Sequence, residues 1–158
     1  MGISGQTTGE ILERFERECI GRVQEGANNI IIIASGINDS RYESGTVRAS
    51  ELVVEEDMRE LICRAKAKTD SVLCVGLTPV DEARTTPLAS DKTMSWRNEN
   101  IVRYDAIIRE LAEEQEVEYV DVWGLIDPKQ NADGLHPGEA GHEAIAAAVL
   151  EHLEKHLK

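Results

Sequence analysis

The chain alternates between short unbroken apolar runs and longer segments in which apolar residues recur at helical spacing. Three runs predict strands, at residues 30–34, 72–78 and 117–122. The first is almost entirely isoleucine, and such a β-branched run predicts a buried parallel strand covered on both faces. The third alternates with polar residues, so we expect it at an edge of the sheet.

Four other segments carry apolar residues every three or four positions, which predicts amphipathic helices. Their stripes are Ile11, Phe15, Cys19 and Val23; Val54, Met58, Leu61, Ile62 and Ala65; Ile101, Tyr104, Ile107, Ile108 and Leu111; and Ile145, Ala148, Val149 and Leu153. Thr7 and Thr8 suit the N-cap of the first helix. We expect the last helix to begin near Gly138 and to run almost to the end of the sequence.

Strands and helices therefore alternate along the chain, which predicts a single α/β domain over residues 1–158 with a doubly wound parallel sheet. Two loops follow predicted strands, at about 39–49 and 79–95. Ligands bind at the carboxyl ends of strands in such sheets, where both loops emerge. The second loop is long for a compact domain, which is typical of a functional or mobile segment.

Charge and composition exclude several classes of function. The net charge is −13, from 30 acidic and 17 basic residues, so a nucleic-acid partner is not expected. No apolar stretch has membrane-spanning length, and no basic region followed by an apolar one marks a signal peptide. The three widely spaced cysteines indicate a reducing cytoplasm, with thiols buried as small apolar groups rather than acting as nucleophiles.

Three segments carry residues suited to chemistry. Asp133 and His136 stand three apart before the last helix, as an imidazole base and its orienting acid can. Asn38 follows the first predicted strand, where its amide can donate to a developing oxyanion. Glycines at 2 and 5 precede the first helix, where free N–H groups can bind an anion. Taken singly, the last two segments also fit ordinary turns and caps, and a histidine before proline also fits a surface position.

Taken together and in this order, the segments resemble blocks II, III and V of the SGNH, or GDSL, family of ester hydrolases. The residues that carry the resemblance are Gly2-Ile3-Ser4-Gly5-Gln6-Thr7, Gly36-Ile37-Asn38-Asp39 and Asp133-Gly134-Leu135-His136-Pro137. The resemblance implies a three-layer flavodoxin-like fold and hydrolysis of small acyl or acetyl esters without a metal or organic cofactor.

The resemblance also implies a role for each matching residue. His136 would be the general base, and Asp133 would orient its ring. The Gly5 N–H and the Asn38 amide would line the oxyanion hole. Trp96 and Trp123 can flank a substrate pocket, although Trp123 fits core packing equally well. Arg41 and Tyr42 can contact substrate, although surface positions are expected for both.

The sequence departs from the family at its first block, the Gly-Asp-Ser that supplies the nucleophile. No Gly-Asp-Ser occurs, so we expect the chain to lack a βαβ unit of roughly 30 or more residues at its N-terminus. Ser4, Ser35 and Ser40 are alternative nucleophiles, but turn and capping roles are favoured for them. A metal site formed by Asp133, His136 and His142 is a weaker alternative.

These observations leave three hypotheses open. The chain is an ester hydrolase that lacks its N-terminal segment, a nucleophile-less relative that binds a ligand or partner, or one part of a two-chain assembly. In the family's sheet order, the absent first strand lies beside residues 30–34. We therefore predict an unpaired strand edge there, which favours self-association and lowers stability.

Overall fold

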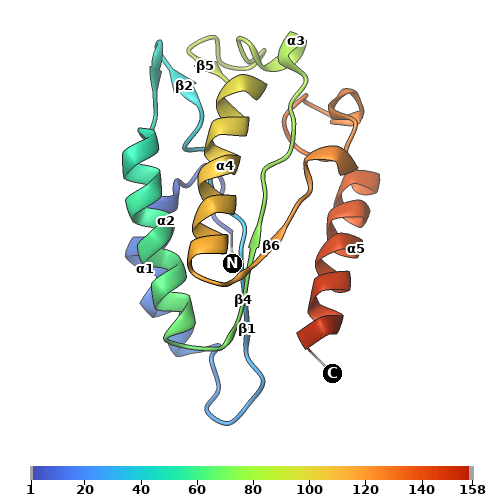
Figure 1. Cartoon of the computed structure of the whole chain (residues 1–158). Coiled ribbons are helices and arrows are strands. Elements are labelled where there is room, and N and C mark those ends of the chain that lie inside the picture. The colour runs from blue at the N-terminus through green and yellow to red at the C-terminus, as the bar shows by residue number, and fades with distance from the viewer. Residues whose placement is uncertain (1, 157–158) are drawn as a thin grey trace.

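A three-stranded parallel sheet forms the centre of the computed structural model, which describes residues 2–156 (Figure 1). Its strands are β1 (Ile30–Ile33), β4 (Ser71–Val75) and β6 (Glu118–Val120), in the order β1-β4-β6. Ile31 pairs with Val72, and Cys74 pairs with Tyr119. All three predicted strands are confirmed, each shorter than expected, and β6 lies at an edge as predicted.

Four long helices flank this sheet: α1 (Thr8–Ile20), α2 (Glu51–Lys66), α4 (Asn98–Glu114) and α5 (Glu139–His156). All four predicted helices are confirmed, although α1 ends before Val23. Thr7 caps α1 in a capping box, in which its hydroxyl accepts from the Glu10 N–H and the Glu10 carboxylate accepts from the Thr7 N–H. Ser50 caps α2 in a similar way, by accepting from the Val53 N–H.

The helices lie on both faces of the sheet and bury two apolar clusters. α1, α2 and α4 cover one face, where the larger cluster includes Phe15, Met58, Leu61, Ile101 and Ile108. α5 stands alone on the other face (Figure 1). Its predicted inward residues pack on a smaller cluster of strand side chains, Leu73, Val75, Val120 and Val122. This is the predicted three-layer α/β arrangement.

The prediction that the isoleucine strand is covered on both faces is wrong. β1 pairs only with β4 among the described residues, and the Ile32 side chain is 45% exposed. The most buried strand is instead β4, whose Leu73 and Cys74 have no exposed surface. The reason is positional, because the apolar side chains of α5 pack against the strand residues of β4 and β6 and those that follow β6, and of β1 only Ile30 belongs to that cluster.

The two predicted loops contain regular structure that the sequence pattern did not indicate. A small antiparallel sheet joins β2 (Tyr42–Glu43) and β3 (Thr46–Val47) from the first loop to β5 (Met94–Ser95) from the second. The second loop also forms the short helix α3 (Glu82–Thr85), and two 3-10 turns, Trp123–Leu125 and Pro128–Gln130, precede α5. Strands of two residues are too short to show a periodicity. Over residues 2–156, no helix combines the length and the hydropathy that crossing a membrane requires.

Candidate active site

Gly5 and Asn38 lie together at the carboxyl end of β1. Asn38 follows β1, and α1 runs back along the sheet, so the turn before α1 reaches the same end (Figure 1). The Asn38 side-chain amide donates to the Gln6 carbonyl at 3.0 Å. That contact uses one of the two amide hydrogens and leaves the second for another acceptor.

Gly5 occupies the third position of a tight turn. The turn is closed by a bond of 3.4 Å from the Gln6 N–H to the Ile3 carbonyl, and Gly5 has a φ of +78°. A positive φ at this position is the requirement of a type II turn, which explains the glycine. The closing bond uses the Gln6 N–H and not the Gly5 N–H.

Asp39 fixes the start of α1 against the segment after β1. Its carboxylate is fully buried and accepts from the Thr8 N–H at 3.0 and 3.1 Å. Burial raises the pKa of Asp39, although the hydrogen bonds from Thr8 oppose that shift. The sequence pattern indicated no role for Asp39 beyond its position next to Asn38.

Asp133 and His136 form a direct pair in the loop before α5. Asp133 Oδ2 lies 2.6 Å from His136 Nδ1, and Asp133 Oδ1 accepts from the backbone N–H groups of Leu135 and His136. Partial burial raises the pKa of Asp133, but the bonds from His136 and Leu135 outweigh it and hold this pKa at about 2. The carboxylate therefore stays charged. Because Asp133 contacts Nδ1 of His136, the other ring nitrogen, Nε2, is left available, and this imidazole is 72% exposed.

This loop is seated on the segment around α3. The Asp81 N–H donates to the Gly134 carbonyl at 2.8 Å, and Arg84 donates to the Asn131 carbonyl at 2.6 Å. Gly134 has a φ of +86°, and a Cβ there would lie 2.8 Å from the Cβ of Arg84. Glycine is thus required both by the backbone conformation and by the close approach of the two segments.

Trp96 connects the two pairs. Its side chain is 3% exposed, and its indole N–H donates to the Ile37 carbonyl at 3.0 Å, next to Asn38. Its backbone exchanges hydrogen bonds with Thr85, the last residue of α3. The hydrogen bonds of Trp96 thus join the surroundings of Asn38 to α3, on which the Asp133–His136 loop is seated.

Several sequence expectations are corrected by this arrangement. Trp96 is buried in the main apolar cluster, while Trp123 is half-buried and packs against that cluster, as the alternative interpretation held. Arg41 is also buried, contrary to expectation, and stacks on Trp96 with its guanidinium 5.5 Å from the ring centre. Tyr42 is half-buried beneath the guanidinium of Arg97.

The alternative nucleophiles are mostly engaged elsewhere. Ser35 shares a 2.9 Å hydrogen bond with Thr8, and the Ser40 hydroxyl donates to the Ile37 carbonyl, whereas Ser4 is exposed. Burial raises the pKa of Cys74 to about 12, which makes it a poor nucleophile, and Cys63 is exposed rather than buried. No metal-binding group of three or more acidic, histidine or cysteine side chains occurs in the described part of the chain.

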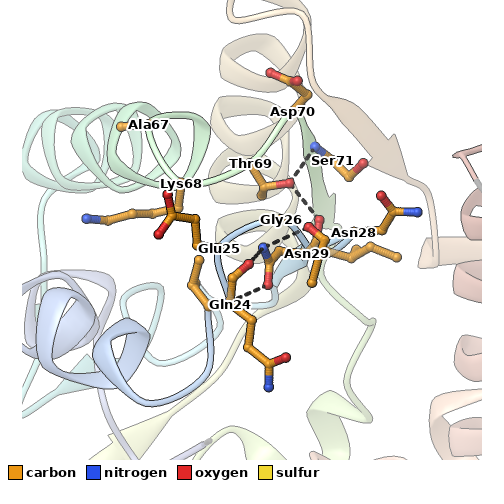
Figure 2. A pocket seen from close by; sticks show the side chains of 13 residues that line it. Gln24, Glu25, Gly26, Asn28, Asn29, Ala67, Lys68, Thr69, Asp70 and Ser71 are labelled. Atoms are coloured by element: carbon orange, nitrogen blue, oxygen red, sulfur yellow. Dashed lines mark hydrogen bonds between the residues drawn. The ribbon is translucent and has the colours of Figure 1, made fainter.

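A cavity of about 670 Å³ lies at the opposite end of the sheet, beside the first residues of β1 and β4 (Figure 2). Hydrogen bonds within its lining centre on Asn29 and Thr69. Asn29 closes its own loop through Gln24 and Ala27, and Thr69 donates to the Asn29 carbonyl at 2.6 Å. This cavity shares no residue with either pair.

Known proteins resemble this chain in sequence and in fold. A model of the GDSL-like lipase/acylhydrolase family matches residues 1–144. A multidomain esterase from Ruminococcus flavefaciens is 26% identical over 140 residues, which cover 86% of this chain and 17% of that protein. The chain thus spans about a sixth of the length of that curated relative.

The solved structures agree on the fold. An acetylxylan esterase from Geobacillus stearothermophilus matches with a TM-score of 0.74 and 22% identity, over 95% of this chain and 68% of that one. A GDSL-like lipase from Bacteroides thetaiotaomicron matches with a TM-score of 0.74 and 22% identity, over 98% and 74%. Identities this low show the fold alone, but the family model covers most of the sequence, and the chain belongs to the GDSL-like lipase/acylhydrolase family.

Proposed function

We propose that this chain carries the base and the oxyanion donors of an ester hydrolase that acts on small acyl or acetyl esters. The observation that carries the proposal is the 2.6 Å contact between Asp133 and His136. The carboxylate engages Nδ1, so Nε2 is the nitrogen available to a serine, as in a hydrolytic triad. The acetylxylan esterase and the multidomain esterase among its relatives support the substrate class.

The proposed mechanism assigns one task to each residue. His136 Nε2 removes the proton from a serine hydroxyl as the serine attacks the ester carbonyl, and Asp133 stabilises the imidazolium that forms. The Gly5 N–H and the Asn38 amide donate to the oxyanion, each contributing about 2.7–4 kcal/mol of transition-state stabilisation. The imidazolium then returns its proton to the departing alcohol, and water releases the acyl group by the same steps.

The serine is proposed to come from polypeptide outside these residues, because no Gly-Asp-Ser occurs in the sequence. The outer edge of β1 is the proposed place for the strand that carries it. A groove of about 520 Å³ runs along that edge between α1 and β1, and Ile11, Phe15, Ile31 and Ile33 contribute to its apolar lining. A parallel strand added there would pair the free edge and end beside Asn38.

The missing serine also favours a second candidate function, in which the chain binds an ester-like ligand or a partner without turnover. The same free edge then serves for self-association or for a second chain. Native-state hydrogen exchange tests the edge directly. Amides of residues 30–33 as strongly protected as those of residues 72–75 in a demonstrated monomer would contradict a free edge.

Hydrolysis of 4-nitrophenyl acetate tests the proposed function, with the 158-residue chain compared to the complete natural reading frame that contains it. We expect turnover only from the complete protein, with a loss of about 10²–10⁴-fold in His136→Ala. His142→Ala is the matched control, since His142 is another exposed histidine on the adjacent helix. An inactive complete protein, or equal activity in both histidine variants, would refute the proposal.

Three free cysteines, one of them exposed, support the cytoplasm as the proposed compartment. Small-molecule esters remain the proposed partners, with no nucleic acid, because the net charge of −13 repels a phosphate backbone. No cofactor enters the proposed mechanism.

A further inference from the structure

Arg48 reaches from the β2–β3 hairpin to the turn that contains Gly5. It directly follows β3, and its backbone N–H donates to the Arg41 carbonyl at 2.8 Å, which ties it to the hairpin. One terminal nitrogen of its guanidinium donates to the Gly5 carbonyl, and the other donates to Glu10 Oε2 at 3.0 Å. The Arg48 side chain is only 25% exposed.

The Glu10 carboxylate gives the guanidinium a fixed counter-charge. Glu10 Oε2 also accepts from the Thr7 N–H at 2.8 Å, in the capping box that begins α1. The hydrogen bond from the Thr7 N–H lowers the pKa of Glu10 most, and the positive charge of Arg48 lowers this pKa further. Arg48 therefore joins an acceptor on the helix to an acceptor in the turn, and its planar fork holds the two with a more rigid geometry than an ammonium would.

Apart from its closing bond of 3.4 Å between the Gln6 N–H and the Ile3 carbonyl, the turn at Gly5 depends on side chains for its conformation. Glycine has the greatest backbone freedom of any residue, and a Cβ built at Gly5 meets nothing within 4 Å. Two successive carbonyls are held instead by side chains from separate elements. Arg48 holds the carbonyl of Gly5, and Asn38 holds that of Gln6.

We propose that Arg48 is a positioning residue of the oxyanion hole. It acts through Gly5 by fixing the orientation of the turn whose Gly5 N–H donates to the oxyanion. The proposal rests on the proposed function for the meaning of that N–H. The hairpin contributes by anchoring the Arg48 backbone through the Arg41 carbonyl.

The first test uses the 158-residue chain itself and follows the Gly5 amide by ¹⁵N NMR. We expect an order parameter of about 0.85 in the wild type and below about 0.6 in Arg48→Met. Arg48→Lys should restore part of the order. Arg64→Met is the matched control, because it breaks a comparable surface pair with Glu60 far from the turn. An unchanged Gly5 amide in Arg48→Met would overturn the proposal.

The second test uses the complete protein and separates positioning from a purely structural role. We expect kcat to fall about tenfold to a hundredfold in Arg48→Met while KM stays within a factor of two. Loss of Gly5 order without a change in kcat would overturn the positioning role. A wild-type protein without esterase activity would refute the proposed function, and the assignment to an oxyanion hole would fall with it, whatever the NMR result.

Discussion

The buried contact between Asp105 and Tyr119 offers the sharpest stability prediction. Asp105 is 5% exposed, and its Oδ1 accepts from the Leu77 N–H at 2.7 Å and from the Tyr119 hydroxyl at 2.8 Å. Burial is the main cause that raises the pKa of Tyr119, so its hydroxyl stays a donor at neutral pH. The contact fixes the chain where it leaves β4 and continues toward α3, the segment that seats the His136 loop.

The expected cost follows from the groups left without a partner. Tyr119→Phe removes one hydrogen bond to a charged acceptor, which corresponds to about 1.5–3 kcal/mol. Asp105→Ala leaves the Leu77 N–H and the Tyr119 hydroxyl without an acceptor, and each unsatisfied group lowers the free energy of unfolding by about 1–3 kcal/mol. The same substitution also removes the cost of burying a carboxylate. The double variant, Asp105→Ala with Tyr119→Phe, has no unsatisfied hydroxyl. Its loss of stability should therefore differ from the sum of the two single losses by a coupling energy of about 2 kcal/mol.

Urea unfolding of the wild type, both single variants and the double variant measures this coupling. Circular dichroism and the slope of each transition check that all four chains fold to the same extent. A coupling energy below about 0.5 kcal/mol would refute the claim that the two side chains stabilise the fold as a pair. Tyr104→Phe is a useful comparison, because its hydroxyl donates to the Ala49 carbonyl and has no link to Asp105.

The remaining predictions concern the two halves of the candidate site. The pKa of Asp133 is lowered from 3.8 to about 2, so the contribution of its carboxylate to stability is present above pH 3.8 and is lost as the pH falls through 2. A pH titration followed by carboxyl ¹³C NMR should show this low pKa, and His136→Ala should raise the pKa of Asp133. Gly134→Ala should cost about 2–3 kcal/mol of unfolding free energy, because strain at positive φ adds to overpacking. Gly5→Ala should cost about 1 kcal/mol of unfolding free energy from backbone strain alone, since a Cβ at Gly5 meets nothing within 4 Å. Equal urea midpoints for Gly134→Ala and Gly5→Ala would contradict the larger cost expected at Gly134.

Much of the candidate site was readable from the sequence because each part is local. The Asp133 and His136 side chains meet within a four-residue loop, and the capping box of α1 involves residues three apart. Chemical type and spacing are enough for such contacts. The roles of Arg48 and Trp96 were not readable, because each depends on a contact between segments at least 43 residues apart.

The sequence by itself determined the three strands of the central sheet, the four long helices, the fold class and the local contact between Asp133 and His136, since periodicity and short-range hydrogen bonding follow from the order of residues. Only the tertiary structure decided which strand is most buried. The isoleucines of β1 are more apolar than the residues of β4, yet Ile32 is 45% exposed while Leu73 is fully buried. Burial depends on which strands pair and where helices cross the sheet. That long-range arrangement cannot be read from the hydrophobic periodicity of any single segment.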